Sequence, residues 1–325
     1  MNNRLAVTGT ERRVFGLLKR RAKAKGRIGL AFSGDQIAVA VLSNDGGPPV
    51  LERCELLPVD AAGGAEAMTA AMRAAVLPRL PVSVVLRPED YQLALVEAPD
   101  VPPAELRAAM RWRLKEAIDF RVEDAVIDVF DVPSQKRSGQ GRMLYAVAAR
   151  RSAVAGYAAA LATVPTLDVV DVPELCLRNI ASALPEAADG VALLHCGEAS
   201  ATFVLVRGAT FYFARQLNLN ATQRLVAGRA AGAPLDSADV VLELQRSLDY
   251  YERHFDQPPI TQIVISAGGP QAQALATELN RDTGFDVGVL DLNSVLSCTQ
   301  PVDPATQRAC LLAVGAAMRA ERRSL

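Results

Sequence analysis

The sequence predicts an α/β protein that consists of two similar halves. Each half opens with a strand, a tight turn that contains glycine and a second strand, at residues 28–42 and 191–215. After each hairpin, short apolar runs alternate with helical patterns, which is typical of sheets covered by helices. Half of the 325 residues are apolar, so the chain can bury about two domain-sized cores.

Short runs that are apolar or alternate between apolar and polar residues predict the strands. They are residues 37–42, 82–86, 92–96, 125–129, 144–148, 167–170, 191–195, 202–206, 210–213 and 262–266. Helices are predicted at residues 104–118, directly after two prolines, and at residues 154–162. A further helix is indicated by an apolar stripe at helical spacing, which is formed by Val241, Leu244, Leu248, Tyr251 and Phe255.

The cysteines and the hydropathy pattern favour a cytoplasmic protein. The chain has five cysteines without a Cys-x-x-Cys pair, namely Cys54, Cys176, Cys196, Cys298 and Cys310. This odd, scattered set predicts reduced thiols rather than a disulfide framework or a zinc site. We also expect no signal peptide and no membrane-spanning helix, because no apolar run approaches the roughly 20 residues that a bilayer requires.

The N-terminal arm has a charge opposite to that of the remaining chain. Residues 1–27 hold nine basic residues against Glu11, a net charge of +8, so the rest of the chain carries −9. Phe15 and Leu18 precede the basic cluster at residues 19–25, as in a short helix on an anionic membrane. An arm with no dedicated role is the alternative. Nucleic acid is not expected as a partner, because the acidic body cannot continue such a contact.

Several motifs occur in an order typical of one protein family. They are the two hairpins, the segment 111–132, the run 244–248, the glycine turn 266–270 and the terminal segment 313–319. Together they resemble the actin-like proteins of type IV pilus assembly, PilM and its MSHA-pilus counterpart MshI, and more distantly FtsA. The resemblance covers residues 27–319 and implies an actin-like, ribonuclease H-like duplicated fold.

The resemblance also implies a map of subdomains. After a basic arm at residues 1–26, subdomain 1A would comprise residues 27–88 and 149–189. The FtsA-type inserted subdomain 1C would span residues 89–148, with Trp112, Ile118 and Phe120 in its small core. Subdomain 2A would comprise residues 190–219 and 261–325. Subdomain 2B, at residues 220–260, would be reduced to little more than one helix.

In the family, an acid at the end of the first strand of each hairpin positions magnesium for ATP. The resemblance places Ala31 and His195 at these two positions, and Ala38 where a basic residue of the returning strand is expected. A vestigial nucleotide pocket would then be formed by Ser33, Gly34, Asp35, Gly197, Glu198, Ala199, Gly268 and Gly269. The alternative is that these glycines serve only the geometry of tight turns.

The missing carboxylates predict a degenerate ATPase site. Phosphoryl transfer needs magnesium to neutralise charge, and acids in the turns themselves, Asp35 and Glu198, would repel phosphate by about 1 to 4 kcal/mol each. We therefore expect no catalytic residue, no metal and no bound cofactor. ATP with Mg²⁺ remains the alternative. A lone histidine in an apolar strand is usually a core residue, so His195 is not expected to be catalytic, and the sequence contains no Walker A or Gly-x-Ser-x-Gly pattern.

The resemblance implies a scaffold of an inner-membrane platform for an MSHA-type or type IV pilus, cytoplasmic and peripheral to the membrane. Its partner would be the cytoplasmic tail of a PilN-like membrane protein, bound between subdomains 1A and 1C. The residues expected at that groove are Tyr91, Leu93, Leu95, Arg111 and Arg113. An active actin-like ATPase or a sugar-kinase relative is the alternative function.

Overall fold

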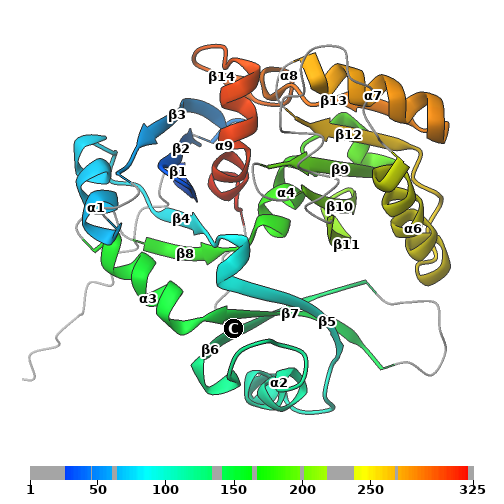
Figure 1. Cartoon of the computed structure of the whole chain (residues 1–325), viewed down its shortest axis with the longest axis horizontal. Helices are drawn as coiled ribbons and strands as arrows, with labels where there is room; N and C mark the ends of the chain where they lie inside the picture. The colour runs from blue at the N-terminus through cyan, green and yellow to red at the C-terminus, as the bar shows by residue number, and fades with distance from the viewer. Residues whose placement is uncertain are drawn as a thin grey trace, which may run out of the picture.

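The computed structural model describes residues 26–44, 46–60, 64–133, 141–162, 167–197, 201–217, 238–267 and 270–320. Two α/β halves lie side by side, and a small third unit lies against both of them (Figure 1). Residues 1–25 of the predicted basic arm lie outside the described residues, as do residues 220–237 of the predicted subdomain 2B.

The first half is built on a six-stranded sheet in the order β14-β3-β2-β1-β4-β8. Strands β1 (Gly26–Ser33), β2 (Gln36–Ser43) and β3 (Val50–Pro58) form an antiparallel meander. Strands β4 (Val82–Val85) and β8 (Leu167–Asp171) continue the sheet in parallel from β1. Helices α1 (Gly64–Ala74) and α3 (Arg151–Ala160) cover one face.

The second half repeats this plan with the strand order β11-β10-β9-β12-β13. Strands β9 (Val191–Cys196), β10 (Ala201–Arg207) and β11 (Thr210–Leu217) form the meander, and β12 (Gln262–Ser266) and β13 (Asp286–Val289) follow in parallel. Helices α6 (Ala238–His254) and α7 (Pro270–Thr283) flank the sheet. Because both halves share one strand order, the predicted duplicated fold is confirmed.

Two helices connect the halves. Helix α4 (Pro173–Ala181) of the first half contacts β9 and β10 of the second, while α9 (Pro304–Ala317), near the end of the chain, packs on β1, β2, β3 and β4. The helices α4 and α9 also contact each other. Short α8 (Leu292–Val295) and β14 (Ser297–Cys298) precede α9, and β14 pairs with β3. The largest hydrophobic cluster therefore spans both halves.

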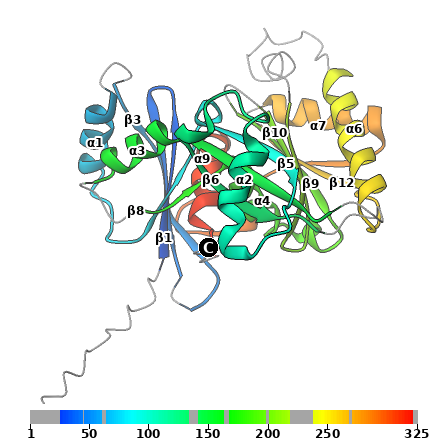
Figure 2. The same ribbon diagram turned by 90° about the horizontal axis from the view of Figure 1, so that it is seen from below.

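The third unit is inserted between β4 and β8 of the first sheet. Its strands β5 (Tyr91–Glu97), β6 (Ala125–Asp131) and β7 (Met143–Arg150) form a separate antiparallel sheet in the order β5-β7-β6. Helix α2 (Leu106–Leu114) lies on its outer side, away from the two halves (Figures 1 and 2). We call residues 91–150 the inserted module.

One prediction about the inserted module's core is wrong. Met110 and Leu114 of α2 are fully buried, whereas Trp112 is 79% exposed. The reason is helical geometry, because residues 110 and 114 are four apart on one face and residue 112 lies on the opposite face. Ile118 and Phe120 do pack against this core.

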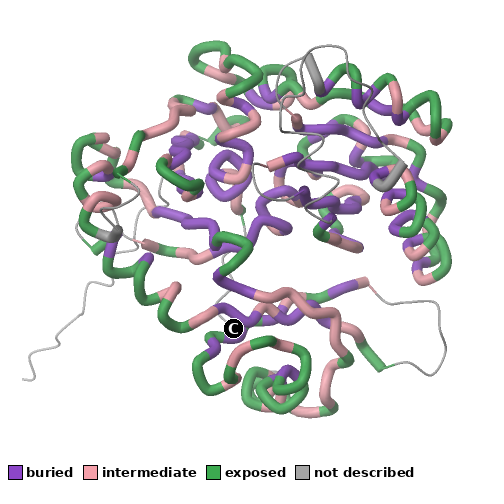
Figure 3. The backbone as a smooth tube through the Cα atoms, in the orientation of Figure 1, coloured by how far each residue is buried: buried purple, intermediate pink, exposed green. Residues whose placement is uncertain are grey.

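All the predicted strands occur, and so do the three predicted helices with shifted ends. Helix α2 is shorter than predicted at both ends, because residues Pro103–Glu105 form a 3-10 turn before it and the helix ends at Leu114. Similar turns occur at Pro88–Asp90, Val122–Asp124 and Pro185–Ala188. Burial follows the central strands and the two crossing helices (Figure 3). None of the helices in the described ranges is long and apolar enough to cross a membrane.

Candidate functional site

The turn between β1 and β2 is a two-residue hairpin. Ser33 pairs with Gln36, which leaves Gly34 and Asp35 as the turn residues. Gly34 has φ +52°, a left-handed conformation that a residue with a side chain rarely adopts. The Asp35 carbonyl accepts a hydrogen bond from the Val59 N–H at 2.6 Å, which ties the turn to the end of β3. Ser33, Gly34 and Asp35 are all exposed.

Ala31 and Ala38 lie opposite each other in the ladder between β1 and β2. Both side chains are buried in the cluster that spans the two halves, whereas Leu30 and Phe32 point to the other face of the sheet. The positions that the resemblance gives to an acid and a base therefore face the core between the halves, and each is filled by a methyl group. A methyl group can neither bind a metal nor contact a phosphate by charge.

His195 near the end of β9 is a buried histidine, only 6% exposed. Its Nδ1 lies 3.4 Å from the Ser266 hydroxyl, and Ser266 is its register partner in the parallel pair with β12. Burial, with a smaller contribution from Arg308, lowers the pKa of His195 to about 4. The imidazole is therefore neutral near pH 7. Burial also raises the pKa of the neighbouring Cys196 thiol to about 12, which argues against a nucleophile there.

The remaining residues of the predicted nucleotide pocket lie only partly within the described ranges. Gly197 directly follows β9, but Glu198, Ala199, Gly268 and Gly269 lie outside the described residues. In the parallel pair of β9 and β12, Ser266 lies opposite His195. The turn that follows β12 therefore begins beside the end of β9. Within the described ranges, no group of three or more histidine, cysteine, aspartate or glutamate side chains is arranged to hold a metal ion.

The five residues predicted for partner binding do not come together. Leu93 and Leu95 pack toward the main body of the protein, whereas Ala94 and Val96 of the same strand pack toward α2. Arg111 and Arg113 lie on α2 itself, on the other side of the module's sheet. The sequence does not show which apolar set of β5 faces which layer, since both sets are apolar.

Tyr91 is buried, and its hydroxyl lies 2.8 Å from both carboxylate oxygens of Glu174 on α4. Burial raises the pKa of Glu174, and hydrogen bonds from Tyr91 and Gln216 partly offset this. A cavity of about 540 Å³ lies beside this pair, between the edge strands β5 and β11. Tyr91 and Leu93 line it, together with Glu174 and Gln216. Tyr91 thus links the inserted module to α4.

A larger groove of about 650 Å³ lies between β6 and β7 of the inserted module, the first half and the start of β11 in the second half. Its apolar lining includes Leu86, Val126, Phe130, Val147, Val154, Val170, Val172, Leu175 and Phe211. Charged residues also line it, namely Asp128, Asp131, Asp171, Arg178 and Arg319. Strand β6 is an edge strand, since the sheet order is β5-β7-β6. The resemblance implies a groove between subdomains 1A and 1C but not its lining by β6, although the sequence of β6 carries a signal for it. Ala125, Ile127 and Val129 are buried toward α2, yet the intervening Val126 and Phe130 are also apolar.

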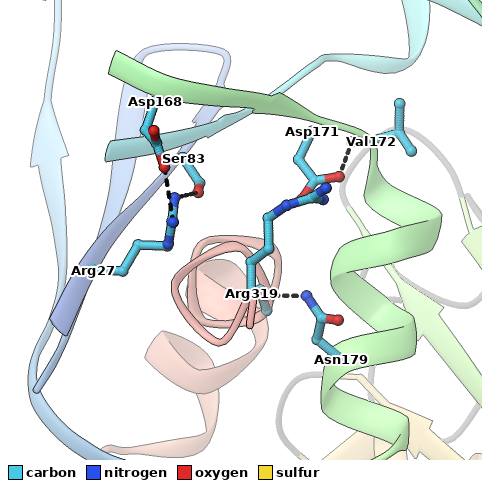
Figure 4. A network of polar contacts seen from close by, with 8 residues as sticks. Arg27, Ser83, Asp168, Asp171, Val172, Asn179 and Arg319 are labelled. Atoms are coloured by element: carbon cyan, nitrogen blue, oxygen red, sulfur yellow. Dashed lines mark hydrogen bonds and ion pairs between the residues drawn. The ribbon is translucent and has the colours of Figure 1, made fainter. Parts of the chain in front are cut away.

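A polar network includes three residues that line this groove, Asp171, Val172 and Arg319 (Figure 4). Arg319, two residues after α9, forms a buried ion pair of 2.7 Å with Asp171 at the end of β8. Asp171 also accepts a hydrogen bond from the Val172 N–H, and the Asn179 amide donates to the Gly315 carbonyl at 2.8 Å. On the far side of α9, Arg27 contacts Ser83 and Asp168 at 2.8 Å each. The ends of β8, α4 and α9 are therefore held together beside the groove.

The repeated sheets and crossing helices define an actin-like fold with an inserted three-stranded module. Among solved structures, the chain is similar to a chain of the PilM–PilN type IV pilus biogenesis complex, at 21% identity and a TM-score of 0.65, over 90% of this chain and 96% of that one. It is also similar to a Bacteroides thetaiotaomicron protein with an actin-like ATPase fold, at 8% identity and a TM-score of 0.50, over 84% and 93% of the two chains.

A third structural match is the cytoplasmic domain of EpsL, an inner-membrane component of the Vibrio cholerae type II secretion system, with 13% identity, a TM-score of 0.47 and 89% and 93% coverage. No protein-family model matches the sequence, and no curated protein matches it either. The likeness in structure establishes the actin-like fold that the sequence predicted.

Proposed function

We propose that this protein is a scaffold of a type IV or MSHA-type pilus assembly platform, at the cytoplasmic face of the inner membrane. In this proposal it holds the cytoplasmic tail of a PilN-like membrane protein and does not hydrolyse ATP. The observation that carries the proposal is the apolar groove along β6, in a fold similar to that found in the PilM–PilN complex.

The groove suits an extended peptide. An edge strand offers backbone N–H and C=O groups to an added strand, and pockets along it select alternate side chains. Val126 of β6 is 37% exposed although it is apolar and lies in the groove, so a bound tail would cover it. The proposal keeps the predicted groove between the first half and the inserted module. It assigns the binding surface to β6 and β7, however, and no longer to Tyr91, Leu93 and Leu95.

A scaffold role also agrees with the first hairpin and with His195. Ala31 and Ala38 offer no charge to a nucleotide, and the neutral His195 cannot replace a magnesium-binding carboxylate. We therefore propose that this protein acts by binding a partner and not by hydrolysing ATP.

The test is a titration of the purified chain with a labelled peptide of the PilN-like protein's cytoplasmic tail. Val126→Asp places a carboxylate in the apolar groove and should weaken binding at least tenfold, which corresponds to about 1.4 kcal/mol. Leu242→Asp is the matched control, because Leu242 on α6 is 45% exposed and lies outside the groove. The proposal fails if no tail peptide binds, or if both variants bind it with the affinity of the unchanged chain.

A further inference from the structure

The chain's single tryptophan lies on the outer surface of the inserted module. Trp112 is 79% exposed, while Met110 and Leu114 of the same helix are fully buried against the sheet. Helix α2 is the outermost layer of the module, on the side away from both halves (Figures 1 and 2). The one aromatic side chain of this helix therefore faces solvent, although the other aromatic side chains of the described residues are buried or half-buried.

Exposed basic residues lie next to this tryptophan in the sequence. Arg111 and Arg113 are its neighbours in sequence, and Lys115 is three residues further on, and all three are exposed. Within the described ranges, Arg113 and Lys115 take part in no ion pair, and Arg111 donates only to the Val122 carbonyl at 3.2 Å. Residues 105–116 hold four basic and two acidic side chains. Because Asp128 of β6 pairs with Arg107 at 3.6 Å, the net charge left on this segment is +1.

We propose that Trp112, Arg111, Arg113 and Lys115 form a contact surface for an anionic lipid bilayer. An indole ring is apolar but carries one N–H group, and for this reason tryptophan concentrates at the boundary between lipid tails and headgroups. Basic side chains beside it are attracted to anionic headgroups by about 1 kcal/mol each. Neither group requires a pocket, which agrees with an outward-facing helix.

This surface binds weakly by itself. One tryptophan and three basic residues supply much less free energy than a membrane-spanning helix, and stable anchoring generally needs two signals. The contact would therefore orient the protein on a membrane to which another segment or a partner also holds it. In that orientation, α2 faces the lipid and the two halves point away from it. The inference does not rest on the proposed pilus function, since it involves only the chain and the lipid.

The single tryptophan allows a direct test with the full chain. Its fluorescence is recorded with vesicles of phosphatidylglycerol and phosphatidylcholine in equal parts, and with vesicles of phosphatidylcholine alone. We expect a shift of the emission to shorter wavelength, and quenching by brominated lipid, with the anionic vesicles only. A chain that lacks residues 1–25 should show the same shift, but at a higher lipid concentration. This truncated chain separates the contribution of α2 from that of the basic arm.

Charge variants complete the test. Arg113→Gln with Lys115→Gln should weaken the partition of the truncated chain by about fivefold for each charge removed. The matched control is Arg79→Gln, which removes an exposed charge from the loop between α1 and β4 and should have no effect. The proposal is overturned if Trp112 emission stays unchanged while the protein sediments with vesicles, or if neutral vesicles give the same shift. It is also overturned if the shift requires a protein partner, or if the charge variants match the control.

Discussion

The backbone of Gly315 in α9 crosses directly over the Cys176 carbonyl of α4. A Cβ atom at residue 315 would lie 2.3 Å from that oxygen, which is closer than any real Cβ contact. The two helices that join the halves, α4 and α9, can pack this closely only because residue 315 has no side chain. This contact is therefore a condition for the arrangement of the two halves.

Gly315→Ala should destabilise the protein by about 2 kcal/mol or more, because the clash is with backbone on both sides. The matched variant is Gly156→Ala in α3, where a Cβ would meet nothing within 4 Å. That change should stabilise the fold by about 0.5 to 1 kcal/mol through the higher helix propensity of alanine. Denaturant unfolding of both variants measures the difference, and equal effects would contradict the close approach of α4 and α9.

The buried pair of Tyr91 and Glu174 gives a second prediction. Tyr91→Phe leaves the Glu174 carboxylate, 1% exposed, with fewer donors and should cost about 1 to 3 kcal/mol of stability. Tyr157→Phe is the control, since Tyr157 donates to Asp90 at 2.7 Å but Arg87 also binds that carboxylate, at 3.0 Å. The control should lose less stability. If the two variants lose the same amount, Glu174 does not depend on Tyr91.

His195 predicts how stability depends on pH. Its pKa of about 4 in the folded state lies below the usual 6.5, so the unfolded chain binds more protons between these values. The contribution of His195 to the free energy of unfolding should therefore be fully present above pH 6.5. It should be lost as the pH drops toward 4, by about 3 kcal/mol at most. In His195→Gln this part of the pH dependence should disappear. An unchanged slope between pH 4 and 6.5 in the variant would show that His195 is not the group responsible.

Ala31 and His195, at the two positions that the resemblance gives to acids, predict no ATP turnover above background. Magnesium-dependent phosphate release measures it directly, and thermal unfolding with Mg-ATP measures binding. A ligand at about 100 times its dissociation constant would add about 2.7 kcal/mol of stability, and we expect no such gain. Turnover that is lost in Asp35→Ala or Glu198→Ala would instead support the ATPase alternative, with acids of the turns as substitutes.

Deletion of residues 1–25 should weaken sedimentation with anionic vesicles and leave the fold intact. The reason is the charge of +8 that the first 27 residues carry, and the effect should fade as salt screens it. Circular dichroism of the truncated chain controls for folding. Equal sedimentation of the full and truncated chains at low ionic strength would exclude the arm as a membrane contact.

The sequence by itself determined the fold class and most of the strands. Hairpin signals, alternation and apolar runs act over neighbouring residues, so these local patterns are enough to predict β1, β2, β9 and β10. The sequence also determined that Ala31 and His195 occupy the two positions that the resemblance gives to acids. Local patterns do not predict the strand β3 or the crossing helices α4 and α9, because the role of these elements depends on partners far away in the chain.

The tertiary structure decided which surfaces remain for binding. Both alternate sets of residues in β5 are apolar, and so are Val126 and Phe130 in the outward set of β6. Periodicity alone therefore does not show that apolar residues line the groove. The resemblance implied a core position for Trp112, but Met110 and Leu114 are buried on one face of α2 and Trp112 is exposed on the other. The sequence decides which side chains are apolar. Whether an apolar side chain is buried depends on which layer covers its face of the sheet or helix, and contacts between distant segments of the chain determine this layer.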